Sequence, residues 1–235
     1  WSKSGIRKIR NKIKETGVQI VCANNNYSIN HSLKLYNTVK NYKNFIESVS
    51  MVDENGRHTV CISSQSGCNL GCDFCATAKM GLMQNLSMGE IIDQLIIIRQ
   101  FSKQPINNVV YMGMGEPFLN YDNVIKSANI INDKKGFNIS ATKITISTVG
   151  IIPQIQQFIN QNIKYRLAIS LNASNNKVRD TIMPINKKWP ISDLIAMNKL
   201  YARQYKRKKI TFEYVIMAGI NDSTENAIEL SKILN

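Results

Sequence analysis

The sequence has no apolar run that approaches the roughly 20 residues needed to cross a bilayer. Its longest apolar stretch lies around Leu95 to Ile98, so no membrane-spanning segment is predicted. Cysteine is also scarce, with five in 235 residues, and no secretory leader is expected. A disulfide framework is therefore not expected, and the predicted location is the cytoplasm, where thiols stay reduced.

Acidic side chains are few as well. Sixteen Asp and Glu residues face thirty Lys and Arg residues, which gives a formal net charge of +14. A charge of this sign and size suits a polyanionic partner such as nucleic acid. The chain is also rich in Asn, Ile and Lys, so a drift in composition is the alternative explanation of the charge.

Four of the five cysteines lie close together in the first third of the chain. Cys68, Cys72 and Cys75 form a CxxxCxxC motif, and Gly67 and Gly71 allow the backbone to bend sharply beside them. Three thiolates can hold a cluster of four irons and leave one iron without a protein ligand. S-adenosylmethionine can chelate that iron through its amino and carboxylate groups. The spacing is the signature of radical S-adenosylmethionine (radical SAM) enzymes.

A structural zinc site is the main alternative for these thiols. Cys61, Cys68, Cys72 and Cys75 could together form a closed tetrahedral set of four ligands. Zinc ligands of this kind usually come as two CxxC pairs some distance apart, which this pattern does not match. The spacing therefore favours the iron–sulfur cluster over zinc.

Residues 57–235 alternate between strand-like apolar runs and helical patterns, as expected for a parallel sheet covered by crossover helices. One of these helices should begin at Ser87, which forms a capping box with Glu90. We predict an α/β fold, an open partial (β/α) barrel of the radical SAM type that lacks its last strand. Its strands are predicted within residues 58–64, 107–112, 143–149, 165–171 and 209–217.

Residues 1–56 are predicted to form a small N-terminal appendage, the remnant of an accessory domain. Residues 3–15 place Ile residues at helical spacing among Lys and Arg, which predicts a basic amphipathic helix. Alternating apolar runs follow, broken by Asn clusters and by Asn55-Gly56, and predict a small antiparallel element. Cys22, in the first of these runs, is expected to be a buried small side chain.

The second predicted strand of the barrel ends in Gly113-Met114-Gly115-Glu116-Pro117. This segment resembles half of a dinucleotide-binding fingerprint, but Phe118 replaces the third glycine and no helix is expected to open immediately. The glycines should let the backbone approach a ligand closely, and Glu116 can accept hydrogen bonds from an ammonium group. A plain tight turn with a solvated Glu is the alternative.

The next two strands end in small polar residues that should meet at the same rim of the barrel. Ser147 follows from one strand, and Ser170, Leu171 and Asn172 from the next. Their hydroxyl and amide groups suit a ribose or a carboxylate. Taken singly, each could instead belong to a turn or a helix cap.

Five segments in order, CISSQSGCNLGCDFCAT, MGMGEP, ITISTVGIIP, ISLNAS and MPINKK, resemble the RlmN/Cfr family of radical SAM adenosine methyltransferases. The resemblance covers roughly residues 45–235 and is closer to the type that methylates C2 of adenosine. It implies a [4Fe-4S] cluster and S-adenosylmethionine as cofactors. It further implies large-subunit ribosomal RNA as substrate, transfer RNA as a second substrate, an external one-electron donor such as flavodoxin, and a monomer.

The same resemblance assigns roles to individual residues. Cys61 matches the cysteine that resolves a covalent RNA intermediate, and Glu47 matches the proposed proton acceptor. The cluster ligands are implied to be Cys68, Cys72 and Cys75. The implied cofactor contacts are Gly115, Glu116, Ser147, Ser170, Leu171 and Asn172.

Two features depart from the family. Asn172 stands where the family usually has His, and Asn cannot titrate near neutral pH. The family also needs a methyl-carrying cysteine near its C-terminus, yet none follows Cys75. The chain begins at Trp1 and stops at Asn235 directly after a predicted helix, so both ends are expected to be cut from a longer protein. A derivative of the family that has lost methyl transfer is the alternative. In either case the chain is expected to cleave the cofactor without methylating RNA. The alternatives are C8 methylation, methylthiolation, or a metal-stabilised RNA-binding module without catalysis.

Overall fold

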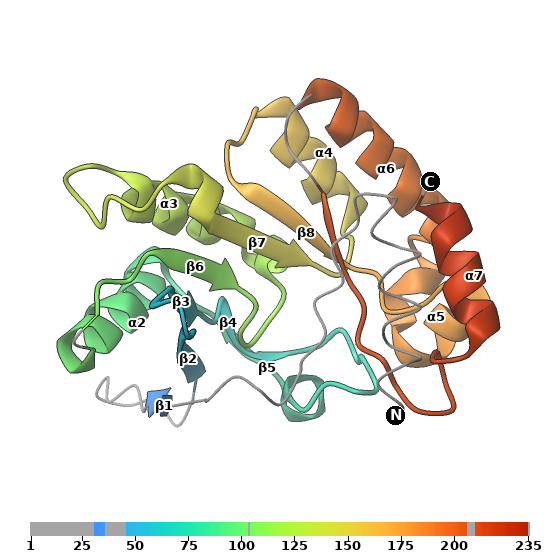
Figure 1. Cartoon of the computed structure of the whole chain (residues 1–235), viewed down its shortest axis with the longest axis horizontal. Coiled ribbons are helices and arrows are strands. Elements are labelled where there is room, and N and C mark those ends of the chain that lie inside the picture. Colours follow the sequence, from blue (N-terminus) through green and yellow to red (C-terminus); the bar gives the residue numbers. More distant parts are fainter. Residues whose placement is uncertain (1–30, 36–45, 103, 206–209, 235) are drawn as a thin grey trace. The chain divides into compact units, whose positions relative to one another are not determined.

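The computed structural model describes residues 31–35, 46–102, 104–205 and 210–234, which Figure 1 shows with their elements labelled. These residues belong to two compact units. The first contains the described residues up to 147 together with 164–166, and the second contains 148–163 and the described residues from 167 onward. The predicted N-terminal helix and the predicted strand with Cys22 lie outside the described residues.

The first unit is built on a sheet with antiparallel and parallel parts. Strands β1, β2 and β3 pair antiparallel, and β6 and β7 continue from β3 in parallel. Of the strands expected from the barrel pattern, β6 thus lies beside the first one, β3, and β7 lies beside β6. The strands are β1 (His31–Leu35), β2 (Ile46–Val52), β3 (His58–Cys61), β6 (Asn108–Tyr111) and β7 (Ile144–Thr148).

One face of this sheet is buried beneath the two helices α2 (Met88–Phe101) and α3 (Tyr121–Asn132) (Figure 1). In α2, Gln94 hydrogen-bonds to Ser48 of β2, and in α3, Ser127 hydrogen-bonds to Tyr111 of β6. The apolar side chains of this face, which supply the hydrophobic driving force for docking the helices, are fully or almost fully buried: Ile46, Val60, Val109, Tyr111, Ile144 and Ile146.

The opposite face of the same sheet is less covered. Strand side chains alternate between the two faces, and the burial of β3 alternates accordingly, with Val60 buried and Cys61 half-buried. Cys61 is aligned with Val110 of β6, which is aligned in turn with Thr145 of β7, and both neighbours are half-buried too. The side chains in the middle of this second face are therefore partly exposed.

The capping box predicted at Ser87 is confirmed. The Ser87 hydroxyl accepts a hydrogen bond from the Glu90 backbone N–H at 3.3 Å, and the Glu90 carboxylate accepts one from the Ser87 N–H at 2.8 Å. Two of the unpaired donors at the start of α2 are satisfied in this way. The capping box thus fixes the start of α2, which follows the cysteine segment in the sequence.

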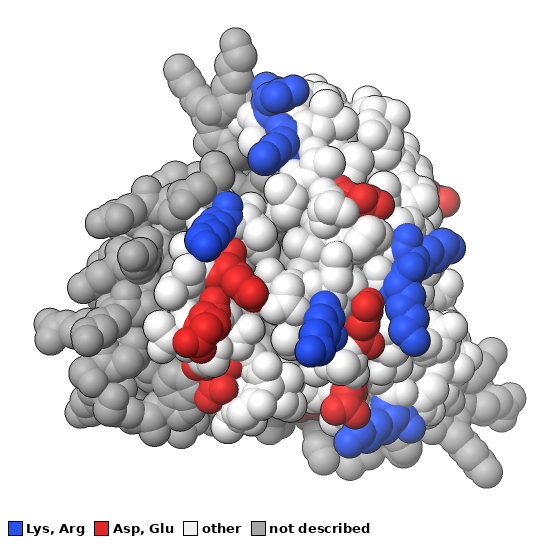
Figure 2. Space-filling view, turned by 90° about the vertical axis from the view of Figure 1, so that its right-hand side faces the viewer, with Lys and Arg blue, Asp and Glu red and all other residues white. Residues whose placement is uncertain are grey.

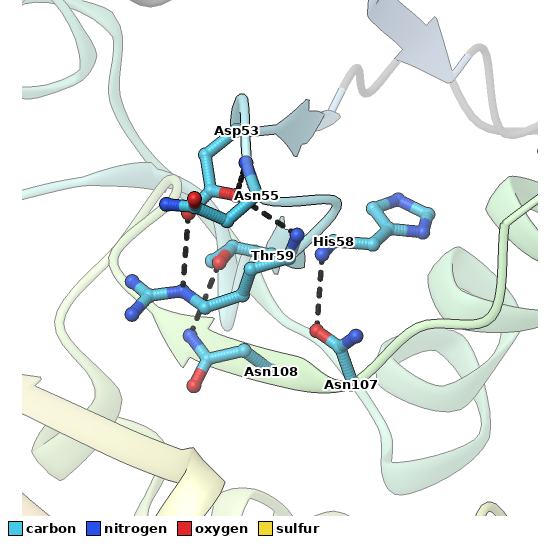
Figure 3. Close-up of polar contacts among 7 residues, drawn as sticks. Asp53, Asn55, His58, Thr59, Asn107 and Asn108 are labelled. Atoms are coloured by element: carbon cyan, nitrogen blue, oxygen red, sulfur yellow. Dashed lines mark hydrogen bonds and ion pairs between the residues drawn. The ribbon is translucent and has the colours of Figure 1, made fainter.

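The turn predicted at Asn55-Gly56 joins β2 to β3 (Figure 3). Gly56 adopts a positive φ of 75°, a conformation that costs glycine little. The carboxylate of Asp53 accepts hydrogen bonds from the backbone N–H groups of Asn55 and Arg57 at 3.0 and 2.9 Å. The turn thus sets the register of the two strands.

Two asparagines attach the start of β6 to β3 (Figure 3). The Asn107 side chain accepts a hydrogen bond from the His58 N–H at 3.0 Å, and the Asn108 side chain donates one to the Thr59 hydroxyl at 3.3 Å. Neighbouring strands from distant parts of the sequence are therefore aligned by side chains as well as by the backbone.

The second unit contains the strand β8 (Arg166–Ser170) from Leu167 onward, the strand β9 (Thr211–Glu213), which pairs with it in parallel, and four α-helices. Gly150 precedes the first helix with a φ of +107°, and a side chain there would overlap Leu194. The glycine is therefore required by both backbone conformation and packing. The helices are α4 (Ile152–Asn160), α5 (Asn176–Ile182), α6 (Ile191–Gln204) and α7 (Thr224–Ile233).

The predicted α/β class is confirmed, and neither unit closes its described strands into a barrel. The sequence pattern missed the short helix α5 and a hairpin inside the cysteine segment. That hairpin consists of β4 (Gln65–Cys68) and β5 (Gly81–Asn85). Within the described ranges, no helix is both long and apolar enough to cross a bilayer.

Candidate active site

The cysteine motif begins on the hairpin of β4 and β5. Cys68 is the last residue of β4 and is aligned with Gly81, the first residue of β5. Gly67 has a φ of +78°, and a side chain there would overlap the carbonyl oxygen of Gly81. The glycine before Cys68 is therefore needed for the two strands of the hairpin to pair closely.

Beyond β4 the chain wraps into a compact loop that carries the other two thiols. Gly71 has a φ of +70°, and the Cys75 N–H donates a hydrogen bond to the Cys72 carbonyl at 3.1 Å. Cys68 and Cys72 are buried and Cys75 is half-buried. The 3-10 helix η1 (Thr77–Met80) then returns the chain to β5.

The Cys68 thiol lies in a mixed electrostatic environment. Its burial raises its pKa, the Leu70 backbone N–H lowers it, and the charges of Glu116 and Cys75 raise it again. A bound cation would reverse this effect and favour the thiolate.

Three neighbouring cysteines with glycine-relieved backbone are suitable ligands for an iron–sulfur cluster. As they stand, no three His, Cys, Asp or Glu side chains among the described residues are gathered closely enough to hold a single metal ion. The ligand set Cys68, Cys72 and Cys75 therefore remains a prediction.

The Gly-Met-Gly-Glu turn after β6 packs directly against the cysteine segment. A Cβ at Gly113 would lie 2.8 Å from the backbone of Ile62 and Ser63, and one at Gly115, where φ is +93°, would overlap the Gln65 side chain. Both glycines are thus required by the close approach of two protein segments. The expected approach to a ligand is not needed to explain them.

Glu116 also begins a helix, so the expectation that no helix opens directly after the turn is wrong. Its carboxylate accepts a hydrogen bond from the Phe118 N–H at 3.0 Å and caps the 3-10 helix η2 (Pro117–Asn120), which α3 follows. The reason lies in Pro117, whose fixed φ suits the first position of a helix. Glu116 is only 3% exposed, which contradicts the alternative of a solvated Glu on a plain turn.

The register of β2 and β3 places Glu47 and Cys61 on the same face of the sheet. Cys61 is aligned with Val49, and Glu47 lies two residues before Val49, so both side chains point away from the helix-covered face. Diagonal neighbours of this kind are about 7–8 Å apart. Ser147 of β7 lies on this face too, two residues beyond Thr145. Three of the predicted site residues are therefore brought to one surface.

In the second unit, the end of β8 is tied to the end of β9. The Ser170 hydroxyl donates a hydrogen bond to the Glu213 carboxylate at 2.8 Å, and the Leu171 and Asn172 N–H groups donate to the Glu213 carbonyl at 3.0 and 3.2 Å. Leu171 is fully buried. Glu213 was not singled out from the sequence, because the strand predicted within 209–217 placed it in the middle, whereas β9 ends at Glu213.

The Asn172 side chain faces the protein interior. Its amide oxygen accepts a hydrogen bond from the Val215 N–H at 2.9 Å, and its amide nitrogen donates to the Met183 sulfur at 3.4 Å. The residue has a φ of +57° and is 2% exposed. Asn tolerates this backbone conformation better than most residues, so Asn172 has a structural function whether or not it contacts a cofactor.

The sequence interpretation also missed Arg179 of α5, which is completely buried. Its guanidinium donates hydrogen bonds to the carbonyls of Leu171 at 2.9 Å, Ser170 at 3.2 Å and Val149 at 2.6 Å, and to the Asn186 side chain at 3.0 Å. These carbonyls follow or end strands that carry predicted site residues. Arg179 therefore holds the rim of the second unit in shape.

The cysteine segment follows β3 in the sequence, and the buried Glu116 follows β6. This order of elements is typical of a radical SAM domain. The model of the radical SAM superfamily matches residues 62–231, and the chain belongs to this superfamily.

Several similar proteins carry the name of one kind of RNA methyltransferase. A protein of Dictyoglomus turgidum named probable dual-specificity RNA methyltransferase RlmN is 51% identical over 192 residues, which cover 80% of this chain and 55% of that protein. One of the same name from Spiroplasma citri is 41% identical, covering 85% of this chain and 58% of its own length. The chain thus spans little more than half the length of these relatives.

A solved structure gives the same result for the fold. The crystal structure of a radical SAM methyltransferase from Sphaerobacter thermophilus matches with a TM-score of 0.77 and 40% identity. The match covers 82% of this chain and 57% of the other. The radical SAM type of fold predicted from the cysteine spacing is therefore confirmed.

Proposed function

We propose that the chain is the radical SAM part of an RNA methyltransferase that acts on C2 of an adenosine in large-subunit ribosomal RNA, and on transfer RNA as well. The observation that carries the proposal is the cysteine hairpin packed against the Glu116 turn, within a chain about half identical to proteins named RNA methyltransferases. Such an enzyme would act in the cytoplasm as a monomer.

Within the first unit, Cys68, Cys72 and Cys75 would hold a [4Fe-4S] cluster, and Glu116 would bind the amino group of S-adenosylmethionine. When bound, the cluster would supply the electron that cleaves S-adenosylmethionine, after reduction by an external donor such as flavodoxin. The buried Glu116 carboxylate is suited to this task because a charge-assisted hydrogen bond gains strength away from water. Gly115 places the Glu116 backbone within reach of the cysteine segment.

Glu47 and Cys61 would act on the RNA. Glu47 would accept the proton that leaves the adenine ring, and the Cys61 thiol would resolve the covalent link between RNA and protein. Their shared face of the sheet supports this pairing. None of the other four cysteines matches a methyl carrier, since three belong to the cluster motif and Cys22 precedes it. Methyl transfer would therefore need a thiol that these 235 residues do not supply.

Ser147, Ser170 and Leu171 would contribute hydroxyl and backbone groups to the cofactor. For Asn172 we propose a backbone contact, since its side chain is engaged by Val215 and Met183. The Asn172 carbonyl accepts one hydrogen bond, from the Asn221 side chain at 2.8 Å, and its second lone pair could serve this contact without the titratable His usual at this position.

The positive charge that supports an RNA partner is unevenly distributed along the sequence. Nine of the thirty Lys and Arg residues lie in residues 1–45, one is Lys103, and four form the run 206–209. The other sixteen share residues 46–102, 104–205 and 210–234 with fifteen acidic residues. On the face in Figure 2, blue and red side chains are correspondingly interspersed. We therefore assign most of the electrostatic attraction for RNA to residues 1–45 and 206–209.

Cleavage of the cofactor tests the proposal most directly. After anaerobic reconstitution with iron and sulfide, the protein should release 5′-deoxyadenosine from S-adenosylmethionine when dithionite is added, because only a bound cluster and an electron are required. Chromatography of the quenched reaction measures the product. Zinc at one per chain, without cluster absorbance or 5′-deoxyadenosine, would instead favour a metal-stabilised RNA-binding module.

Glu116→Gln should weaken binding of S-adenosylmethionine by at least about tenfold. The substitution removes the charge from a hydrogen bond to an ammonium group, which is worth about 1.5–3 kcal/mol. Isothermal titration of cluster-loaded protein measures the affinity. Glu54→Gln, which changes an exposed carboxylate in the turn between β2 and β3, serves as the control. Equal affinities of the two variants would refute the role of Glu116.

A further inference from the structure

Gln65 occupies the junction between the cysteine hairpin and the Glu116 turn. It is the first residue of β4, the strand that ends in Cys68, and only 1% of it is exposed. Its backbone N–H donates a hydrogen bond to the Met114 carbonyl at 3.2 Å, and its side chain packs against Gly115 with no space for a Cβ between them. The residue is thus in contact with the turn along its whole length.

The oxygen and the nitrogen of the Gln65 side-chain amide both form hydrogen bonds. The amide oxygen accepts a hydrogen bond from the Glu116 N–H at 2.7 Å, and the amide nitrogen donates one to the Asn85 side chain at 2.7 Å. Asn85 ends β5 and is aligned with Gln65 across the hairpin. The amide therefore connects both strands of the hairpin to the backbone of Glu116.

A glutamine amide satisfies both contacts as the neighbouring groups are oriented. A carboxylate could accept from the Glu116 N–H but could not donate to Asn85, and an apolar side chain of similar size could do neither. The loss would leave a buried N–H of Glu116 without its acceptor, and buried unpaired groups displace the backbone that carries them. The Glu116 carboxylate is itself held by the Phe118 N–H, so any movement of this backbone moves the carboxylate.

We propose that Gln65 is a positioning residue that sets the Glu116 carboxylate for the amino group of S-adenosylmethionine and keeps it in register with the cysteine hairpin. The inference rests on the proposed function, because it takes Glu116 as the amino-group ligand. It goes further by proposing that Gln65 influences binding of the amino-acid part of the cofactor and not of its adenosine part. Substitution of Gln65 should therefore not change the affinity for a ligand that lacks the amino acid.

Two ligands and two variants test this assignment. Gln65→Met keeps the unbranched shape and removes both polar ends, whereas Gln65→Glu keeps the oxygen that accepts from the Glu116 N–H. Gln100→Met, in an exposed position of α2, is the matched control. The affinities for S-adenosylmethionine and for 5′-methylthioadenosine, which lacks the amino acid, are measured on cluster-loaded protein. Iron content and absorbance are recorded before each titration.

We expect Gln65→Met to bind S-adenosylmethionine about tenfold more weakly and 5′-methylthioadenosine within about twofold of the parent. Gln65→Glu should restore part of the lost affinity. In a Glu116→Gln background, Gln65→Met should add less than twofold, because the two residues act through one contact. If Gln65→Met does not load a cluster, Asn85→Ala takes its place, with a threefold loss expected for S-adenosylmethionine alone.

The inference is overturned if both ligands weaken equally, which would make Gln65 a general structural residue, or if neither weakens. The parent protein separates this failure from that of the proposed function. A parent that cleaves S-adenosylmethionine while Gln65→Met binds it normally refutes only the role of Gln65. A parent that binds S-adenosylmethionine no more tightly than 5′-methylthioadenosine refutes both.

Discussion

Replacement of Cys68, Cys72 or Cys75 by Ala is expected to abolish the iron–sulfur absorbance of the reconstituted protein, whereas Cys61→Ala should retain it. The three residues occupy the end of β4 and the loop that follows it, within eight positions of one another, and Gly67 and Gly71 adopt positive φ beside them. Cys61 instead ends β3, in the middle of the sheet between β2 and β6. A cluster with one open iron needs only three thiolates.

The same four variants separate the cluster from a four-cysteine zinc site. Iron, sulfide and zinc contents are measured together with the absorbance spectrum after identical anaerobic reconstitution. Complete loss of metal from Cys61→Ala would mean that all four thiolates are ligands, as expected for zinc. A Cys61→Ala protein with parental iron and sulfide, still able to cleave S-adenosylmethionine, would instead restrict Cys61 to a step on the RNA.

Local sequence patterns were sufficient to predict most of the regular structure. The apolar alternation around Val60 and Val109 predicted the strands β3 and β6, and the Ser87–Glu90 pair predicted the start of α2. These predictions are correct because burial of one face of a strand or helix requires apolar residues at a regular spacing, and that spacing is visible in the sequence. The ends of the strands were predicted too long by up to several residues, since the apolar pattern continues beyond the last backbone pair in β9.

The missed hairpin of β4 and β5 has no such pattern. Gln65 to Cys68 are all buried although three of the four are polar or glycine, because the strand is enclosed by the Glu116 turn and by β5. The side chains of this strand fit contacts with residues that are distant in the sequence. Asn85 lies 20 positions and Glu116 51 positions from Gln65. Tertiary contacts of this kind leave no periodic signal in the sequence.

The candidate site was predictable to a similar extent. The sequence was sufficient to propose cluster ligands from the cysteine spacing and an ammonium ligand at Glu116. The contacts of Gln65, Asn172 and Arg179 could not be predicted, because their hydrogen-bond partners come together only in the fold. Asn172 also illustrates the limit of resemblance, because its side chain is engaged by Val215 and Met183 in the protein interior. A position that matches a family motif can therefore contribute through its backbone.

Arg179→Met is expected to lower the free energy of unfolding of the second unit by about 3–5 kcal/mol. The guanidinium is fully buried and donates to three backbone carbonyls and one side chain, and hydrogen bonds to charged groups are worth about 1.5–3 kcal/mol each before relaxation. Met has a similar shape but no donor, so the carbonyls after β7 and at the end of β8 would lose their partner. Arg179→Lys should be intermediate, since one ammonium cannot reach all four acceptors.

Urea denaturation followed by the fluorescence of Trp189 measures this loss, in a Trp1→Phe background so that a single tryptophan gives the signal. Arg203→Met, on the exposed side of α6, is the matched control and should change the stability by less than about 1 kcal/mol. Because Arg179 holds the carbonyls of Ser170 and Leu171, S-adenosylmethionine should also bind more weakly at urea concentrations where the unit is still folded. An Arg179→Met protein as stable as the control would mean that these carbonyls find other donors, and that the rim of β8 is held by Glu213 through Ser170 and the N–H groups of Leu171 and Asn172.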